Sequence, residues 1–106
     1  MATVKHHGTG VALMEGAIDV NETRWLWFSW PSAVSSSEWI LPAGWALEGA
    51  QIGSTVIGDN GKAHKNCNGA LIKPAGPTGN YLVTNRCVLE NGEALDRTVQ
   101  IKLRVL

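Results

Sequence analysis

Three histidines and two cysteines are the side chains of this chain best suited to bind a metal ion. Zinc takes imidazole and thiolate ligands, usually from pairs spaced as Cys-x-x-Cys or His-x(3–5)-His. His6 and His7 are adjacent near the start of the chain, and His64, Cys67 and Cys87 follow much later. Neither spacing occurs among them. The sequence therefore predicts no metal site, and it gives no reason to expect a cofactor.

Catalytic constellations are equally hard to find in this chain. It has no Gly-x-Ser-x-Gly elbow, no phosphate-binding loop and no His-Glu-x-x-His motif. General acid and base catalysis needs two titratable groups held close together, and no spacing here pairs two of the carboxylates. We therefore expect a protein without enzymatic activity and name no catalytic residue. Carboxylates are dispersed along the chain, among them Asp19, Glu22, Glu38, Glu48, Asp59, Glu90, Glu93 and Asp96.

Tryptophan is the residue type that stands out, with five in 106 residues. Trp30 and Trp39 are predicted to lie in a core, which leaves Trp25, Trp27 and Trp45 as candidates for a protein interface. Exposed tryptophan marks an interaction site, and at interfaces it often supplies much of the binding energy. A low charge content of 17% favours the same interpretation.

Indole rings also stack on sugars, so a carbohydrate-binding or host-adhesion module is the alternative. A sugar site needs polar groups beside an aromatic floor. Trp27 together with Asn21 or Asn85 is conceivable, although no spacing in the sequence enforces it.

The elements that must position these side chains are strands. Within residues 94–106, residues 98–105 alternate strictly, with Val99, Ile101, Leu103 and Val105 on the face that we expect to lie in the core. A polar turn containing Asn91-Gly92 joins this run to residues 79–89 and indicates a terminal β-hairpin.

Residues 22–30 form the strand candidate richest in aromatic side chains. Leu26, Phe28 and Trp30 share one face, and Trp25 and Trp27 share the other. Both faces are apolar, whereas a strand in a two-layer sandwich buries only one of them in its own core. We therefore expect Trp25 and Trp27 to be covered by another protein chain or by the N-terminal arm.

About seven strands at a spacing of roughly 8–12 residues indicate an all-β, immunoglobulin-like sandwich of two antiparallel sheets. We expect the sandwich over residues 21–106, preceded by residues 1–20 as an extended arm or loosely attached first strand. Tyr81, at the start of a strand, resembles the tyrosine that caps a loop in such domains. Cys67 and Cys87 suit either buried free thiols or an inter-sheet disulfide. We expect free thiols, because no cysteine lies in the second strand, where immunoglobulin domains place one.

Bulk composition excludes several partners. The formal net charge is zero, so the chain has no basic footprint for nucleic acid or for an acidic membrane surface. No apolar run approaches the roughly 20 residues that span a bilayer. The N-terminus lacks the apolar stretch of a secretory signal, and we expect synthesis in a cytoplasm.

Three segments taken in order resemble a known family. They are residues 38–44 (EWILPAG), 79–86 (GNYLVTNR) and 92–101 (GEALDRTVQI). Over residues 22–106 the chain is similar to small phage and prophage proteins of about this length, which are encoded among virion structural genes and expected to have an immunoglobulin-like fold. The extra aromatics at Trp25 and Trp27 and the two cysteines depart from that pattern.

This resemblance implies a bacteriophage virion structural protein that is assembled in the host cytoplasm. A capsid decoration or cement role fits best, and a head-to-tail or tail accessory role comes next. The expected partners are other virion proteins, either capsid subunits or neck and tail subunits, together with copies of the chain itself related by symmetry.

Overall fold

The computed structural model describes the backbone of residues 4–6, 11–58 and 60–106, and the side chains of residues 17–58 and 60–106. Every regular element within these residues is a strand. The elements are β1 (Val4–His6), β2 (Val11–Asp19), β3 (Arg24–Ser29), β4 (Val34–Ile40), β5 (Ala46–Ile57), β6 (Ala63–Lys73), β7 (Gly79–Leu89) and β8 (Ala94–Arg104).

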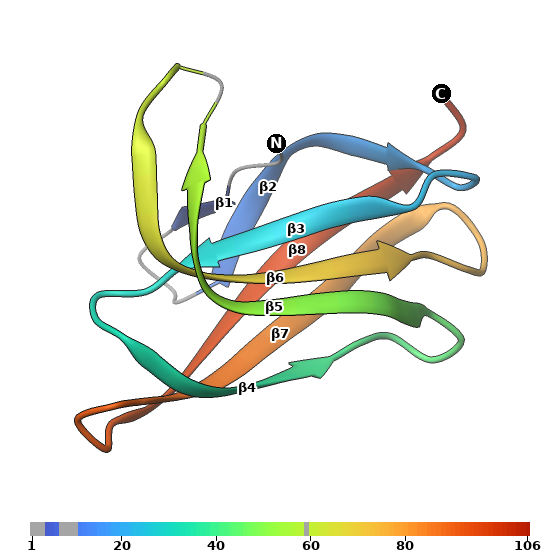
Figure 1. The fold of residues 1–106 in the computed structure, drawn as a ribbon. Helices are drawn as coiled ribbons and strands as arrows, with labels where there is room; N and C mark the ends of the chain where they lie inside the picture. Colours follow the sequence, from blue (N-terminus) through green and yellow to red (C-terminus); the bar gives the residue numbers. More distant parts are fainter. Residues whose placement is uncertain (1–3, 7–10, 59) are drawn as a thin grey trace.

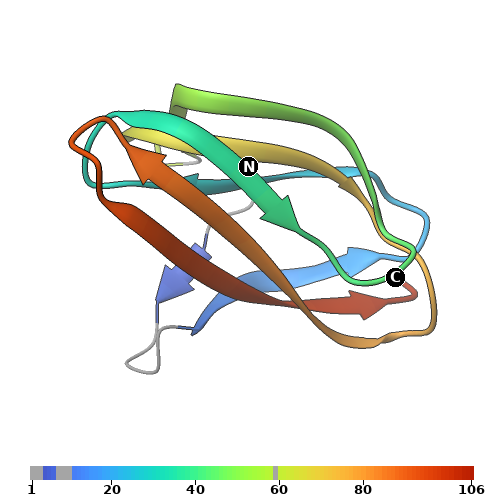
Figure 2. The ribbon, with the colours of Figure 1, turned by 90° about the horizontal axis from the view of Figure 1, so that it is seen from below.

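Two sheets form the sandwich predicted from the strand spacing. One has the order β1-β2-β8-β7-β4 and the other the order β3-β6-β5. The strands from β2 to β8 build the two layers, and short β1 extends one edge (Figures 1 and 2). Strands β3, β6 and β5 correspond to B, E and D of an immunoglobulin domain, and β4, β7 and β8 correspond to C, F and G. The prediction of an all-β immunoglobulin-like sandwich is confirmed.

The N-terminal segment is more closely integrated than an extended arm. β2 pairs in parallel with β8, from Val11 opposite Thr98 to Asp19 opposite Arg104, with one register shift. Ile18 at its end is buried in the core. Every other pairing between the described strands is antiparallel. Much of residues 1–20 therefore forms a strand of the domain and not an arm, because β2 pairs with β8 and buries Ile18 in the core.

The terminal hairpin forms as predicted. β7 and β8 pair from Gly79 opposite Leu103 to Val88 opposite Ala94, and the Leu89 N–H donates to the Glu93 carbonyl across the turn. Gly92 takes a φ of 93°, a left-handed conformation that glycine adopts without steric cost.

One of the four core positions predicted in the last strand is wrong. Val99, Ile101 and Leu103 are fully buried, but Val105 is 76% exposed. β8 ends at Arg104, and the next backbone contact is the Leu106 N–H donating to the Asp19 carboxylate. Val105 thus follows the last paired residue of β8, where the alternation of side chains between the two faces of a strand no longer applies.

Two buried asparagines connect the sheets. Asn85 on β7 accepts hydrogen bonds from the Trp30 Nε1–H at 3.1 Å and from the Asn68 side-chain amide on β6 at 2.9 Å. Its own amide donates to the Ser37 hydroxyl and to the Glu38 carbonyl. Both oxygen and nitrogen of Asn85 are therefore satisfied inside the core, where an unpaired polar group is costly.

Tyr81 adopts the expected corner arrangement. Its hydroxyl donates to the carbonyl of Pro77, four residues earlier, and its ring packs on Trp45 with centroids 5.0 Å apart. The loop between β6 and β7 is held against the sandwich at this point.

Candidate functional site

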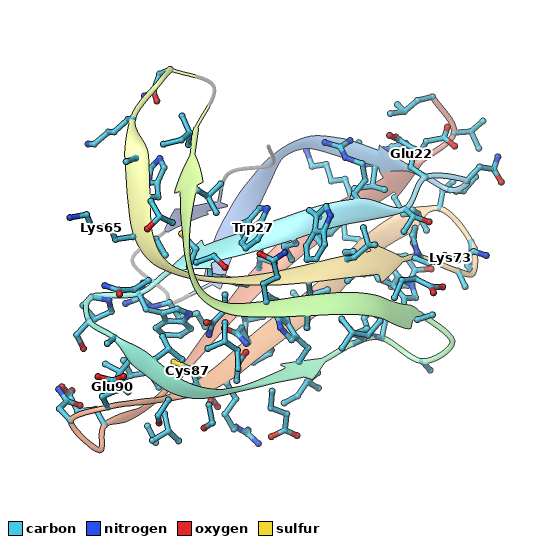
Figure 3. The ribbon with its side chains drawn as sticks, viewed as in Figure 1. Glu22, Trp27, Lys65, Lys73, Cys87 and Glu90 are labelled. Carbon is cyan, nitrogen blue, oxygen red and sulfur yellow. The ribbon has the colours of Figure 1, made fainter. Side chains whose placement is uncertain are left out.

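β3 presents Trp25 and Trp27 to the side away from the core. Leu26, Phe28 and Trp30 are buried, as predicted, and alternation directs the two neighbouring indoles outward. Trp25 and Trp27 are half-buried and stack on one another, with ring centroids 5.2 Å apart and planes inclined by 17°. Figure 3 shows Trp27 on the front of the three-stranded sheet, away from β7 and β8.

Strand pairing extends this pair into a continuous surface. Residues opposite each other in adjacent strands share a face of the sheet, so the register defines three rows across β3, β6 and β5. None of the residues in these rows carries a charge. We call this surface the indole face. Its rows are Trp25–Leu71–Gly49, Trp27–Gly69–Gln51 and Ser29–Cys67–Ser54.

Glycine at position 69 makes room for the Trp27 ring. A Cβ built on Gly69 would lie 2.3, 2.6 and 2.7 Å from three atoms of the six-membered ring, which is far inside van der Waals contact. The ring therefore lies directly against the backbone of β6. Gly49 is less constrained, because the nearest atom of Trp25 would be 3.6 Å from its Cβ. Both indoles are thereby held close to the sheet.

Polar groups on the indole face are few and partly used. The Ser54 hydroxyl donates to Gln51 Oε1 at 3.1 Å, and the Ser29 hydroxyl donates to the Lys65 carbonyl at 3.1 Å. Gln51 is exposed and lies across Gly69 from Trp27. Its amide nitrogen is the group on this face best placed to donate to a ligand.

Both cysteines are free and buried. Cys67 is opposite Ser29 on the outward side of β6 but only 2% exposed, and Cys87 is enclosed within the sandwich. Burial raises the pKa of each thiol, because removal from water disfavours the thiolate. They therefore behave as small apolar side chains rather than reactive thiols.

Trp45 belongs to the core, and its prediction as an interface residue is corrected. It is 7% exposed, and its Nε1–H donates to the Ala75 carbonyl at 2.9 Å. The partner carbonyl lies 30 residues away along the chain, so the local sequence gave no sign of it. With its polar end satisfied and its ring against Tyr81, Trp45 has little surface to offer another molecule.

Trp30 and Trp39 follow the expected core assignment to different degrees. Trp30 is buried beneath the guanidinium of Arg97, which lies 4.7 Å from its ring centroid. Trp39 is half-buried and packs on Phe28, with centroids 5.6 Å apart. Its buried Nε1 has no hydrogen-bond partner among the residues that the structure describes.

The polar residues suggested for a sugar site are not brought together with Trp27. Asn85 is fully buried on the other sheet and bonded to Trp30. Asn21 lies in the turn before β3, where its N–H donates to the Asp19 carboxylate. Gln51 is the polar residue closest to the position that a sugar site beside Trp27 would need. The sequence pattern missed it because only the pairing of β5 with β6 places it near Trp27. The sequence pattern also missed the role of Gly69. A glycine inside a strand suggests a close approach by another group, but only the pairing of β3 with β6 shows that this group is Trp27.

The outward face of the other sheet has a different character. Arg86 and Asp96 form a bidentate ion pair there, with contacts of 3.0 and 3.2 Å, and Thr84 and Thr98 share a hydrogen bond. The pairing with Asp96 raises the pKa of Arg86. Leu82 is 56% exposed on this face. This face thus carries charged, polar and apolar groups, whereas the three rows of the indole face carry no charge, although the exposed Lys73 borders them on the same side of β6.

In the part of the chain that the structure describes, no group of three or more His, Cys, Asp or Glu side chains is arranged to hold a metal ion. His7 and the side chain of His6 lie outside the described residues. Within the described part, no helix is long and apolar enough to cross a membrane.

Comparison with known proteins adds no relative to this description. No protein-family model, no curated protein and no solved structure matches the chain.

Proposed function

We propose that this protein is a non-enzymatic bacteriophage virion structural protein whose indole face is buried against another subunit of the particle. A capsid decoration or cement role comes first, and a head-to-tail or tail accessory role second. The observation that carries the docking proposal is the uncharged surface around the stacked Trp25 and Trp27. The motif resemblance over residues 22–106 supports the assignment to a virion.

The physical argument is that the indole face leaves apolar surface in water, which burial against a partner would remove. Two adjacent, partly exposed indoles leave apolar surface in water, and a chain with zero net charge lacks the repulsion that would keep such surfaces apart. Among the described residues, the N-terminal segment does not provide a cover, because β1 and β2 extend the other sheet. In a particle, a contact of modest affinity becomes strong when repeated by symmetry.

Mass spectrometry of purified phage particles tests the virion assignment. A copy number near a simple fraction of the major capsid protein is expected for a decoration protein. A dozen copies or fewer would indicate a neck or tail position, and absence from purified particles would refute the assignment.

A second experiment tests the surface. Replacing Trp25 and Trp27 together by serine should weaken binding to particles by at least about 2 kcal/mol, the size of an interface hot spot. The thermal midpoint should fall only slightly, because the core side of β3 is unchanged. A large loss of stability instead would assign the two indoles to the fold of the isolated chain.

Carbohydrate binding remains the second candidate, and Gln51 is the observation that favours it. An amide beside an indole is a common way to hold a sugar, and Gln51 lies across Gly69 from Trp27. Under this alternative, the serine variant keeps its particle binding and loses binding to a host glycan.

A further inference from the structure

We propose that Asn60, in the turn between β5 and β6, is a site of spontaneous deamidation, at which the folded chain converts an amide to a carboxylate. The inference goes beyond the proposed function and does not depend on it, because Asn60 is not part of the indole face. Asn-Gly pairs, the dipeptide most prone to this reaction, occur at residues 60–61, 68–69 and 91–92. The structure places them in three different settings.

The reaction needs only the chain and water. The Gly61 nitrogen attacks Cγ of Asn60, the new C–N bond closes a succinimide ring, and the bond between Cγ and Nδ2 breaks. The amide nitrogen leaves as ammonia, with a proton that replaces the one given up by the Gly61 nitrogen. Water then adds to one of the two ring carbonyls and opens the ring to aspartate or isoaspartate. Glycine favours the attack because no side chain shields its nitrogen.

The two exposed turns share one pattern of hydrogen bonds. In each turn the glycine N–H donates to the carbonyl three residues earlier, at 2.9 Å for Gly61 and 3.0 Å for Gly92. Asn60 Oδ1 and Asn91 Oδ1 each accept the N–H of the residue two positions later, at 3.0 Å. Because the glycine N–H must lose its proton and the asparagine Cγ must turn toward it, each turn has to open before the ring can close.

The turn between β7 and β8 has further restraints that oppose opening. Asn91 Nδ2 donates to the Glu93 carboxylate at 2.7 Å, so this amide is held at both its oxygen and its nitrogen. The Glu90 N–H donates to the Ala33 carbonyl at 2.9 Å, and the Leu89 side chain is buried in the core. Opening this turn therefore disturbs the contact with the segment before β4 and the packing of the sandwich.

The turn between β5 and β6 is less firmly held. Asn60 is exposed, and among the described residues its side chain bonds to the Lys62 N–H alone. Gly58 takes the position that Leu89 has in the other turn and has no side chain to anchor in the core; the half-buried His64 imidazole lies beside it instead. The ends of β5 and β6 at this turn project beyond the other sheet (Figure 1). Opening costs less free energy where fewer buried contacts are lost, so Asn60 reaches the reactive geometry more often.

Asn68 is protected by the sandwich itself. Its side chain is fully buried and donates to Asn85 Oδ1, and Gly69 is paired with strands on both sides. Reaction at this pair requires loss of the three-stranded sheet and not the opening of a turn.

The product also suits position 60 better than position 91. An aspartate at position 60 keeps an oxygen that can accept the Lys62 N–H. An aspartate at position 91 would place a carboxylate where the amide now donates to Glu93, so two like charges would meet. We therefore expect a deamidated form that keeps its fold and carries one additional negative charge.

Peptide mapping by mass spectrometry compares the three sites in one sample. After incubation of the full folded chain in mildly alkaline buffer, Asn60 should be deamidated at least about tenfold faster than Asn91, and Asn68 should stay intact. In guanidinium chloride the three sites should react within about threefold of one another, because the same dipeptide is then free of the fold. Equal rates at Asn60 and Asn91 in the folded chain, or an intact Asn60 under conditions where the denatured chain reacts, would refute the inference.

Hydrogen exchange measures the opening of the turns directly. The Gly61 N–H should exchange at least about tenfold faster than the Gly92 N–H, although both make the same hydrogen bond. Equal or greater protection at Gly61 would remove the physical basis of the proposal.

Matched variants test the restraint and the site. Glu93→Ala removes the acceptor of Asn91 Nδ2 and should raise the deamidation rate of Asn91 about two- to fivefold, whereas Lys62→Ala should change that of Asn60 less than twofold. Asn60→Gln should abolish the first acidic form that isoelectric focusing detects in the native chain, because the longer side chain closes a ring much less readily. An acidic form that appears at the native rate in Asn60→Gln would overturn the assignment to Asn60.

Discussion

Asn85 is the side chain on which both sheets converge. It takes the Trp30 and Asn68 N–H groups on one side and donates to Ser37 and to the Glu38 carbonyl on the other. Immunoglobulin domains often join their sheets by a disulfide in this part of the fold. Here a hydrogen-bonded cluster makes a connection between the sheets, and the two cysteines remain free.

Replacing Asn85 by leucine should lower the free energy of unfolding by about 3 kcal/mol. The substitution leaves the Trp30 indole and the Asn68 amide without their acceptor, and each buried unsatisfied group costs about 1–3 kcal/mol. Urea denaturation measures the loss. Asn80→Leu, at an exposed position on the same strand, should change stability by less than about 0.5 kcal/mol. A loss below about 1 kcal/mol for Asn85→Leu would show that the cluster contributes little.

The thiols give a second prediction at this scale. Titration in denaturant without reductant should find two reactive thiols per chain, from Cys67 and Cys87, whereas the folded chain should react slowly. Because burial raises their folded pKa above the ordinary value of 9.0, they contribute stability below that pH and lose it as the pH rises further. Stability should therefore decline above about pH 9. Finding no reactive thiol in denaturant would reveal a disulfide.

Among the elements, β3 is the strand that relates the core to the proposed surface. Its inward side chains are buried, and its outward pair lies over glycines contributed by β6 and β5. The second apolar face of this strand therefore has a partial explanation within the chain itself. The glycines of the neighbouring strands leave room for the two stacked rings to lie against the sheet.

The Gly69 position can be tested with a single methyl group. Gly69→Ala should displace the Trp27 ring toward water and lower stability only slightly, by about 1 kcal/mol or less, because the ring lies on the outward face and not in the core. Loss of the exciton signal of the stacked indoles in circular dichroism would report the displacement. Gly49→Ala is the matched control, since its Cβ would sit at an ordinary 3.6 Å from Trp25. An unchanged exciton signal in Gly69→Ala would show that the ring does not depend on glycine.

At the scale of the whole molecule, the first strand closes the larger sheet. β2 covers the edge of β8 that would otherwise be free, and Ile18 contributes to the common core. The Asp19 carboxylate then accepts the N–H groups of Asn21 and Leu106, which lowers its pKa. The end of β2 and the last residue of the chain are thus held side by side.

A chain lacking residues 1–18 should consequently be less stable than the full chain. Loss of Ile18 alone is worth about 2–5 kcal/mol on the scale of buried isoleucine truncations, and the pairing with β8 is lost as well. Thermal or urea denaturation measures the change, and Ile18→Ala in the full chain separates the side chain from the strand. An unchanged midpoint for the truncated chain would mean that residues 1–18 do not stabilise the sandwich.

Much of this architecture could be predicted from local patterns in the sequence. Alternation with a period of two identified the last strand, the two faces of β3 and the inward side of each, since successive side chains in any strand point to opposite sides. Asn91-Gly92 located the terminal turn for a similar reason, because its conformational preference is a property of those residues alone. Tyr81 followed from its place at the start of a strand.

Long-range contacts settled what alternation leaves open. Trp45 is buried because a carbonyl from a distant loop accepts its N–H, and Val105 is exposed because β8 ends one residue earlier. The indole face exists because the register sets Gly69 and Gln51 beside Trp27. A strand's own residues specify which side chains share a face. The partners opposite them depend on how strands far apart in the chain pair, and a slip of one residue would exchange them all.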